Sequence, residues 1–274
     1  SDPVRQSPIG QGFISNASFV TKDQMTSTRV EPNTAGSTYS FTGKLDFQPV
    51  ENVDIVLGVT VDNSTRDAFI YSFSMFNSDN NPQVINNNYR AFGRFRESFK
   101  SKPGALIQDA FYTIQFNYTD QEQVVQDPRL KDNYFGYGYL GTFNRQYTPQ
   151  YVYTRDSVNG KSLLAYYEEV PTESKVTFTP GGLNIDAENY TKEFFDLNGG
   201  SVTNFTQVQS QGGLINGQTP PLIYSLWAAP GTIYSQYYKS KNEQYDLNAS
   251  GSATINKKHT IKFGIEYQQN VSRS

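Results

Sequence analysis

The chain has 274 residues, a net charge of −3, 36% hydrophobic residues and no cysteine. This composition excludes a disulfide framework and thiol chemistry, and the weakly acidic balance provides no basic surface for nucleic acid. No apolar run approaches 18 residues. A transmembrane helix is therefore excluded, but a membrane barrel is not, because its strands carry a weaker hydropathy signal.

Alternating apolar and polar residues predict six antiparallel strands after an irregular first segment. Residues 1–38 are polar, contain several Pro and Gly residues, and are expected to form loops. In each expected strand one face carries aliphatic, aromatic or Gly residues and the opposite face carries polar ones, because side chains alternate between the faces. The expected strands cover 39–48, 53–62, 89–99, 106–118, 242–255 and 260–268.

Between these strands the alternation weakens. Residues 63–88 are rich in Asn, Asp and Ser, with a further strand expected around 69–75. Residues 186–197 predict a short helix with Asp186 as its N-cap. The rest of 119–241 is rich in Tyr, Asn, Gly and Pro, and short β pieces are expected at 134–143, 150–155, 161–168 and 175–178.

Three connections between the expected strands are very short, at 49–52, 100–105 and 256–259. In bacterial outer-membrane barrels the periplasmic turns are short and the extracellular loops are long. If these turns are periplasmic, the strand directions place 63–88 and 119–241 outside the cell. The predicted organisation is an irregular segment 1–38, barrel strands 39–118, a large extracellular loop region 119–241 and a barrel hairpin 242–274.

The alternation by itself fits two kinds of protein. Its polar and apolar faces could separate solvent from the core of a soluble β-sandwich, or a polar lumen from lipid in an outer-membrane barrel. A long irregular insertion is unusual in a compact soluble domain but ordinary at the mouth of a large barrel.

Several segments resemble TonB-dependent outer-membrane receptors, and in particular the large Oar-like members found in Bacteroidota. Residues 41–58, Phe-Thr-Gly-Lys-Leu-Asp-Phe-Gln-Pro-Val-Glu-Asn-Val-Asp-Ile-Val-Leu-Gly, resemble a barrel hairpin of that family. The ordered set of motifs covers most of 30–270. The other matching segments are 132–143, 178–184, 212–217, Leu226-Trp227 and 263–268.

The resemblance implies an all-β fold, an antiparallel transmembrane β-barrel of 22 strands with long extracellular loops, closed by an N-terminal plug. Neither the plug, nor the TonB-contacting box, nor the terminal strand is identified in this chain. Six strands are also too few for even the smallest barrel, which has about eight. The chain is therefore expected to be an internal segment of a longer protein, contributing part of the barrel wall.

The implied function is a receptor in the outer membrane of a Gram-negative, Bacteroidota-like cell. It would bind a bulky ligand at the cell surface and import it with energy from a TonB complex acting through the plug. The expected partners are outer-membrane lipid, lipopolysaccharide, the TonB complex and a surface lipoprotein, with no nucleic acid and no cofactor. Two alternatives stay open: a Tyr-rich glycan-binding β-sandwich of a secreted or surface protein, and a structural barrel wall in an export or adhesion assembly.

A row of arginines is the first candidate site. Arg90, Arg94 and Arg96 would share one strand face, with Phe92 among them. A charge facing lipid near mid-membrane costs roughly 2–4 kcal/mol, so these side chains are expected to face the lumen. They would hold anionic plug residues or steer substrate, and a structural salt-bridge ladder is the favoured interpretation. Glu97, on the opposite face, is expected near the periplasmic rim.

Aromatic residues of the predicted extracellular region are the second candidate site. They would form a ligand platform at the barrel mouth, although girdle residues or loop packing are the favoured interpretation. The candidates are Tyr137, Tyr139, Tyr151, Tyr153, Tyr224, Trp227, Tyr234, Tyr237 and Tyr238.

Catalytic and metal sites are poorly supported, and no enzyme activity is expected. The single histidine, His259, lies in a short turn and is interpreted as solvated. No His-carboxylate cluster has metal-ligand spacing, and the glycine pairs lack the Lys-Ser/Thr that a phosphate loop needs. Charged loops or Asn/Asp turns explain the remaining candidates better than glycosidase or calcium chemistry does. Those candidates are Glu168 with Glu169, Asp186 with Glu188, Asp62 with Asn63 and Asp67, and Asp79 with Asn80.

Overall fold

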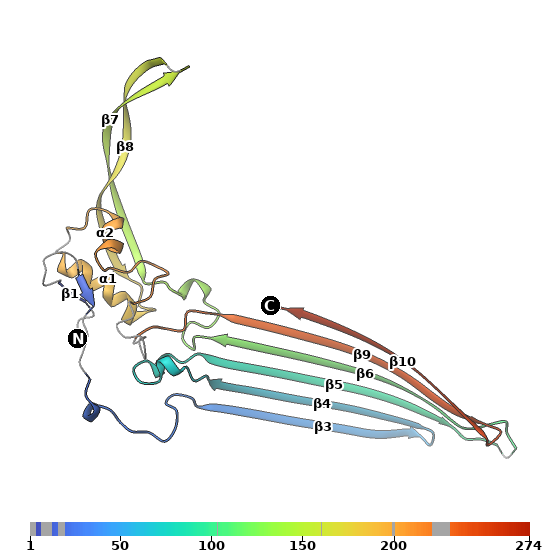
Figure 1. Ribbon diagram of the computed structural model, residues 1–274. Coiled ribbons are helices and arrows are strands. Elements are labelled where there is room, and N and C mark those ends of the chain that lie inside the picture. Colours follow the sequence, from blue (N-terminus) through green and yellow to red (C-terminus); the bar gives the residue numbers. More distant parts are fainter. Residues whose placement is uncertain are drawn as a thin grey trace. The chain divides into compact units, whose positions relative to one another are not determined.

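The computed structural model describes residues 4–6, 13–15, 20–102, 104–159, 161–198, 201–220 and 231–274. The protein is mostly β, with few helices (Figure 1). It divides into two compact units that are interleaved along the chain. Unit 1 comprises 1–32, 69–81 and 129–235, and unit 2 comprises 33–68, 82–128 and 236–274.

Unit 2 is one antiparallel sheet of six strands, in the spatial order β10-β9-β6-β5-β4-β3. The sheet is open and not closed into a barrel, and within the described ranges neither of its edge strands, β3 and β10, pairs with a further strand. The strands are β3 (Gly36–Val50), β4 (Val53–Asp67), β5 (Gln83–Phe99), β6 (Ile107–Gln126), β9 (Tyr238–Ile255) and β10 (His259–Arg273).

The short connections of the sheet all lie at one end. Because every neighbouring pair is antiparallel, the β3–β4, β5–β6 and β9–β10 turns fall on the same side. The long connections, 68–82 between β4 and β5 and 127–237 between β6 and β9, leave from the other end. This is the arrangement that the strand directions inferred from the sequence require.

The strands extend well beyond the alternating segments. β4 continues to Asp67, β5 begins at Gln83 and β6 continues to Gln126, inside segments predicted as loops. In these extensions polar side chains occupy both faces and bond across the strands. The Asn63 amide donates to Asn87 at 2.8 Å, for example. The apolar pairs of the extensions, Val84 with Val125 and Ile85 with Val124, fall on opposite faces, so no single apolar face forms and the alternation gives no sign of these ends.

The strand predicted around 69–75 is wrong. The segment forms two short 3₁₀-helices, η2 (Tyr71–Phe73) and η3 (Ser78–Asn80). Asn77 lies between them and organises the loop: its side chain accepts from Gly231 N–H at 3.0 Å and donates to the Thr232 carbonyl at 2.7 Å. Bonds to a distant segment of unit 1 therefore replace the regular ladder of a strand.

Unit 1 contains a long hairpin of β7 (Gly141–Val158) and β8 (Lys161–Pro180), which twist about each other in Figure 1. Two helices, α1 (Ile185–Leu197) and α2 (Phe205–Ser210), pack near its base, where a core of Val176, Phe194, Val202 and Val208 is buried. The remaining elements are β1 (Val4–Gln6) paired with β2 (Phe13–Ser15), and the 3₁₀-helices η1 (Lys22–Gln24) and η4 (Tyr134–Gly136).

Three sequence predictions for unit 1 need correction. The β pieces expected at 150–155, 161–168 and 175–178 are parts of one continuous hairpin, with register shifts near Gln146 and Asp156 that interrupt the alternation. The piece expected at 134–143 is wrong for most of its length, because Tyr134–Gly136 forms η4 and β7 begins only at Gly141. The predicted helix over 186–197 is confirmed as α1, but its N-cap is Asn184, not Asp186. Asp186 lies in the first turn, where a carboxylate interacts favourably with the helix dipole.

Candidate functional site

The sheet of unit 2 has one apolar and one polar face. Residues paired in register share a face, so the odd residues of β3, β4, β5, β9 and β10 and the even residues of β6 lie together on what we call the apolar face. Its side chains are unusually exposed: Phe41 is 62% exposed and Ile265 is 73% exposed. As described, unit 2 contains a single sheet, so no second layer of the unit covers them.

The apolar residues form a band of limited height. It runs over 39–47 in β3, 53–61 in β4, 110–118 in β6, 245–255 in β9 and 261–267 in β10, which is seven to eleven residues per strand. A membrane-spanning β-strand needs about 9–11 residues when tilted. The band is therefore as high as the hydrocarbon core of a bilayer, although each strand is longer.

Tyrosines mark the boundary of the band on the side of the long connections. In five of the six strands the last residue of the band is a tyrosine: Tyr39, Tyr89, Tyr118, Tyr245 and Tyr267. The rings of Tyr118 and Tyr245 lie 5.1 Å apart. Tyrosine is favoured at membrane–water boundaries because its ring is apolar and its hydroxyl is wet.

Beyond this boundary the same face becomes charged on β6, β9 and β10, whereas on β3, β4 and β5 it continues with Ser37, Asn63 and Asn87. Lys241 pairs with Asp120 at 3.1 Å and with Glu243 at 3.3 Å, and Glu243 also pairs with Arg273. One strand position further on β6, Glu122 pairs with Lys239 at 3.0 Å. On these three strands the apolar band is thus followed by cross-strand ion pairs.

Glu97 is the charge that the sequence places on the otherwise apolar face. It lies close to the β3–β4 turn, where its carboxylate accepts from Tyr112 Oη–H at 2.7 Å and from the Asn52 amide at 3.4 Å. These bonds satisfy the carboxylate at the end of the band, beside the short turns.

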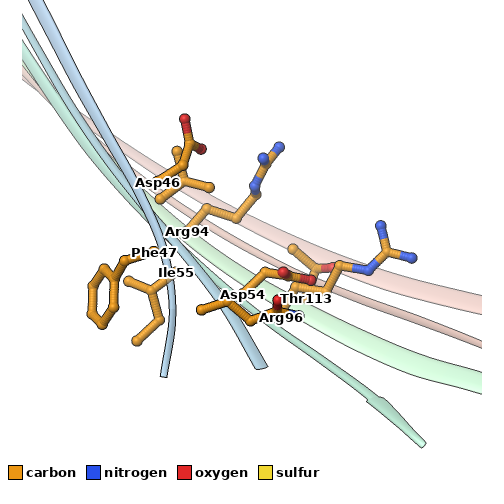
Figure 2. A pocket seen from close by; sticks show the side chains of 9 residues that line it. Asp46, Phe47, Asp54, Ile55, Arg94, Arg96 and Thr113 are labelled. Carbon is orange, nitrogen blue, oxygen red and sulfur yellow. The ribbon is translucent and has the colours of Figure 1, made fainter. Parts of the chain in front are cut away.

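The polar face carries the predicted row of arginines. Arg90, Arg94 and Arg96 are exposed on this face of β5, and Figure 2 shows Arg94 and Arg96 pointing away from Phe47 and Ile55. The Arg96 guanidinium lies 4.3 Å from the centre of the Phe111 ring. Arg90 and Arg94 form no ion pair with any residue that the structure describes.

Two open hollows lie along this row. The first, of about 380 Å³, is lined by Arg94 and Arg96 together with Asp46, Asp54 and Thr113 (Figure 2). The second, of about 400 Å³, contains Arg90 with amide and hydroxyl side chains and one carboxylate, from Asn117, Thr119, Gln121, Gln244 and Asp246. Local sequence gave no sign that Asp46 and Asp54 lie near the arginines, because only the strand register brings them together. The polar face therefore offers both charges and many hydrogen-bonding groups to whatever it faces.

The nominated aromatic residues fall into separate groups. Tyr151 and Tyr153 lie on one face of the β7–β8 hairpin, where register adds two tyrosines that sequence reasoning missed, Tyr147 and Tyr167. All four are at least half exposed, and the Tyr153 and Tyr167 rings lie 5.5 Å apart. We call these four residues the tyrosine face. Tyr147 follows the same odd-numbered alternation as Tyr151, but Tyr167 could be found only from the register.

The other nominated aromatics lie elsewhere. Tyr139 packs against Gly181 at the base of the hairpin, and Tyr137 donates from its hydroxyl to the Lys131 carbonyl. Tyr238 is exposed on the polar face of β9. The remaining residues are Tyr234 and Tyr237, both half-buried, and Tyr224 and Trp227, which lie outside the described residues.

Three glycine-rich segments, 132–143, 178–184 and 212–217, meet at the base of the hairpin. Asn216 joins two of them: its Oδ1 accepts from Leu140 N–H at 2.7 Å and its amide donates to the Gly141 carbonyl at 3.0 Å. Gly181 N–H donates to the Leu140 carbonyl at 2.8 Å. These three segments, which are far apart in the sequence, form one structural cluster.

The carboxylates considered for catalysis have structural partners or face apart. Glu188 is buried and accepts from Gly181 N–H at 3.1 Å and Gly182 N–H at 2.8 Å. Glu168 and Glu169 are adjacent in β8 and so point to opposite faces. Over the described ranges, no group of three or more His, Asp or Glu side chains could hold a metal ion.

Glu173 of β8 pairs with Arg145 of β7 and also accepts a hydrogen bond from the first residue of α2. Arg145 Nε donates to one oxygen of Glu173, and Phe205 N–H donates to the other at 2.9 Å. The bond from Arg145, then the bond from Phe205, lowers the pKa of the Glu173 carboxyl, and the same Arg145–Glu173 bond raises the pKa of Arg145. Glu173 thereby holds the first turn of α2 against β8.

No protein-family model, curated protein or solved structure matches the chain. None of the described helices is long and apolar enough to span a membrane.

Proposed function

We propose that the six-stranded sheet is an arc of the wall of a transmembrane β-barrel, in an outer-membrane receptor of the TonB-dependent type. The receptor would bind a bulky ligand at the cell surface and import it with energy from a TonB complex. The observation that carries this proposal is the exposed apolar band, bounded by tyrosines in five strands and followed by ion pairs on β6, β9 and β10. The assignment to the receptor family rests on the ordered motifs of the sequence.

The height of the band supports lipid as the medium that covers it. Burying apolar area is worth roughly 25 cal/mol per Å², so a whole exposed face of a sheet is a large unfavourable surface in water. A second protein layer packed on this face would not be expected to end at a row of tyrosines in five strands. A bilayer accounts for such a row, because its hydrocarbon core has a fixed thickness and tyrosine is favoured at its boundary with water.

The two free edges support a larger barrel. Unpaired backbone groups are not tolerated in lipid, so membrane sheets close on themselves. Within the proposal, further strands pair with β3 and β10 and continue the wall. The polar face then lines the lumen, and Arg90, Arg94 and Arg96 lie across from whatever fills it.

The connectivity supports ligand capture on one side of the membrane. Both long connections leave the sheet at the end opposite the short turns and contribute segments of unit 1. In outer-membrane barrels that end is extracellular. The exposed tyrosine face of the hairpin belongs to these segments and supplies large, rigid, amphipathic contact area, which is typical of binding surfaces.

Spin labels on the full chain in lipid vesicles test the membrane assignment. The absence of cysteine allows single labels at Phe116→Cys and Leu247→Cys on the apolar face, and at Gln115→Cys and Asn248→Cys next to them on the polar face. We expect the apolar-face labels to be relaxed by oxygen, which partitions into lipid, and the polar-face labels by a water-soluble nickel chelate.

The soluble-sandwich alternative predicts a different result. There, labels at Phe116 and Leu247 would be protected from both reagents, as in a packed core, and the chain would stay in solution without detergent. That outcome would refute the barrel wall.

A further inference from the structure

Two prolines face each other in the middle of the β7–β8 hairpin. Pro149 and Pro171 are direct partners in the ladder, and both are exposed. Opposed residues in an antiparallel pair either exchange two N–H···O bonds or exchange none. Proline has no N–H, so the pair must be of the type that exchanges none.

This pairing fixes where the missing donors would have pointed. In a pair without mutual hydrogen bonds, the backbone N–H and C=O groups point away from the partner, toward the outer edges of the ribbon. Pro149 therefore removes an outward donor from the β7 edge, and Pro171 removes one from the β8 edge at the same level. On β7 the nearest outward donors are those of Tyr147 and Tyr151, about 14 Å apart at ~3.4 Å per residue.

The hairpin needs such protection. Its strands have 18 and 20 residues, and in the part of the chain that is described no further strand pairs with either edge, although near the base Val176 N–H donates to the Val202 carbonyl at 2.9 Å. The ribbon around the prolines is rich in Tyr, Thr and Val, which favour strands. Long free edges of that composition are templates for pairing with another chain, and proline on an edge is one of the devices that prevents it.

We propose that the Pro149–Pro171 pair is an edge guard: it prevents the hairpin from adding a strand of a second copy of this chain along either edge. The pair lies well inside the ribbon, away from the turn that follows Val158, so it is not turn chemistry. With both edges closed to strand addition, the hairpin stands as a single ribbon, and the tyrosine face remains its means of contacting a partner.

The double substitution Pro149→Thr/Pro171→Thr tests the guard in the full chain. Threonine restores both outward N–H groups and suits a strand. We expect the variant to associate as its concentration rises, with its mass at least doubling in sedimentation or light scattering, while the native chain keeps its own mass. Thr148→Val/Thr172→Val is the matched control, because this neighbouring pair also gains strand preference but its N–H groups point toward each other.

Three outcomes decide the proposal. Association of the proline variant alone supports it. An unchanged mass of that variant, or equal association of the control, overturns it. If the double variant does not fold, Pro149→Thr and Pro171→Thr are measured singly. Each single variant should allow strand addition along one edge only, so that it forms dimers and no larger assemblies. The measurement works in detergent or in plain buffer, so its failure is distinguishable from failure of the barrel assignment.

Discussion

The ring of Phe92 lies over Gly58, its direct partner on the neighbouring strand. A Cβ atom at Gly58 would come within 2.2 Å of that ring. Both residues lie on the polar face, so the glycine makes room for an aromatic ring inside the row of arginines. The same arrangement recurs on the apolar face, where the Phe263 ring lies over Gly251.

Replacing Gly58 with Ala is expected to displace the Phe92 ring and to destabilise the sheet by about 1–3 kcal/mol, the range typical of overpacked sites. Gly264→Ala is the matched control, since it lies on the same face and its Cβ would have no neighbour closer than 3.7 Å. The urea midpoints of both variants, in the same detergent or buffer, are compared with that of the native chain. Equal decreases in the urea midpoint of the two variants would show that the Phe92–Gly58 contact makes no specific contribution to stability.

A charge on the apolar face should be far more damaging than one on the polar face. Phe116→Arg places a guanidinium in the middle of the apolar band, and the proposal predicts a loss of about 2–4 kcal/mol in lipid. Gln115→Arg, one residue earlier on the polar face, should cost less than about 1 kcal/mol. Unfolding in lipid vesicles gives both values, and similar losses at the two positions would argue against lipid contact.

The central part of the sheet was predictable because one of its faces is uniformly apolar. Alternation requires that kind of face, and Leu45, Leu57 and Phe116 provide it. The outer ends of the same strands were not predictable. There Asn63 and Asn87 bond across the ladder, and polar residues on both faces leave no period to detect.

The hairpin of unit 1 was hidden for a different reason. Its register shifts near Gln146 and near Asp156, so the alternation of one half does not continue into the other. Tyr167 reaches the tyrosine face only through pairing with Tyr153, a contact that no local pattern specifies. Asn216 likewise gives no local signal, since its partners at Leu140 and Gly141 are distant in the chain.

The proposal also predicts which ends of the strands face the outside of the cell. A cysteine at Gln150→Cys, on the exposed hairpin, should react with a membrane-impermeant maleimide in intact cells that make the full chain. A cysteine at Lys258→Cys, in the short β9–β10 turn, should react only after the outer membrane is permeabilised. Because both positions are exposed, the contrast reports the membrane side and not burial. Labelling of Lys258→Cys in intact cells would reverse the assignment.

The Arg145–Glu173–Phe205 contact should make unit 1 sensitive to acid. The pKa of Glu173 is lowered in the folded chain, first by the bond from Arg145. Its stabilising effect is therefore complete above the unfolded value of about 4.3 and is lost as the pH falls through the folded pKa. The Glu173→Gln variant should be less stable than the native chain at neutral pH, and this difference in stability should become smaller as the pH falls from 5 toward 3. Hydrogen exchange of the α2 amides at each pH measures the difference. The other carboxyls titrate in both chains, so their effect cancels in the comparison. A stability difference that does not change with pH would mean that Glu173 carries no charge-dependent bond in the folded state.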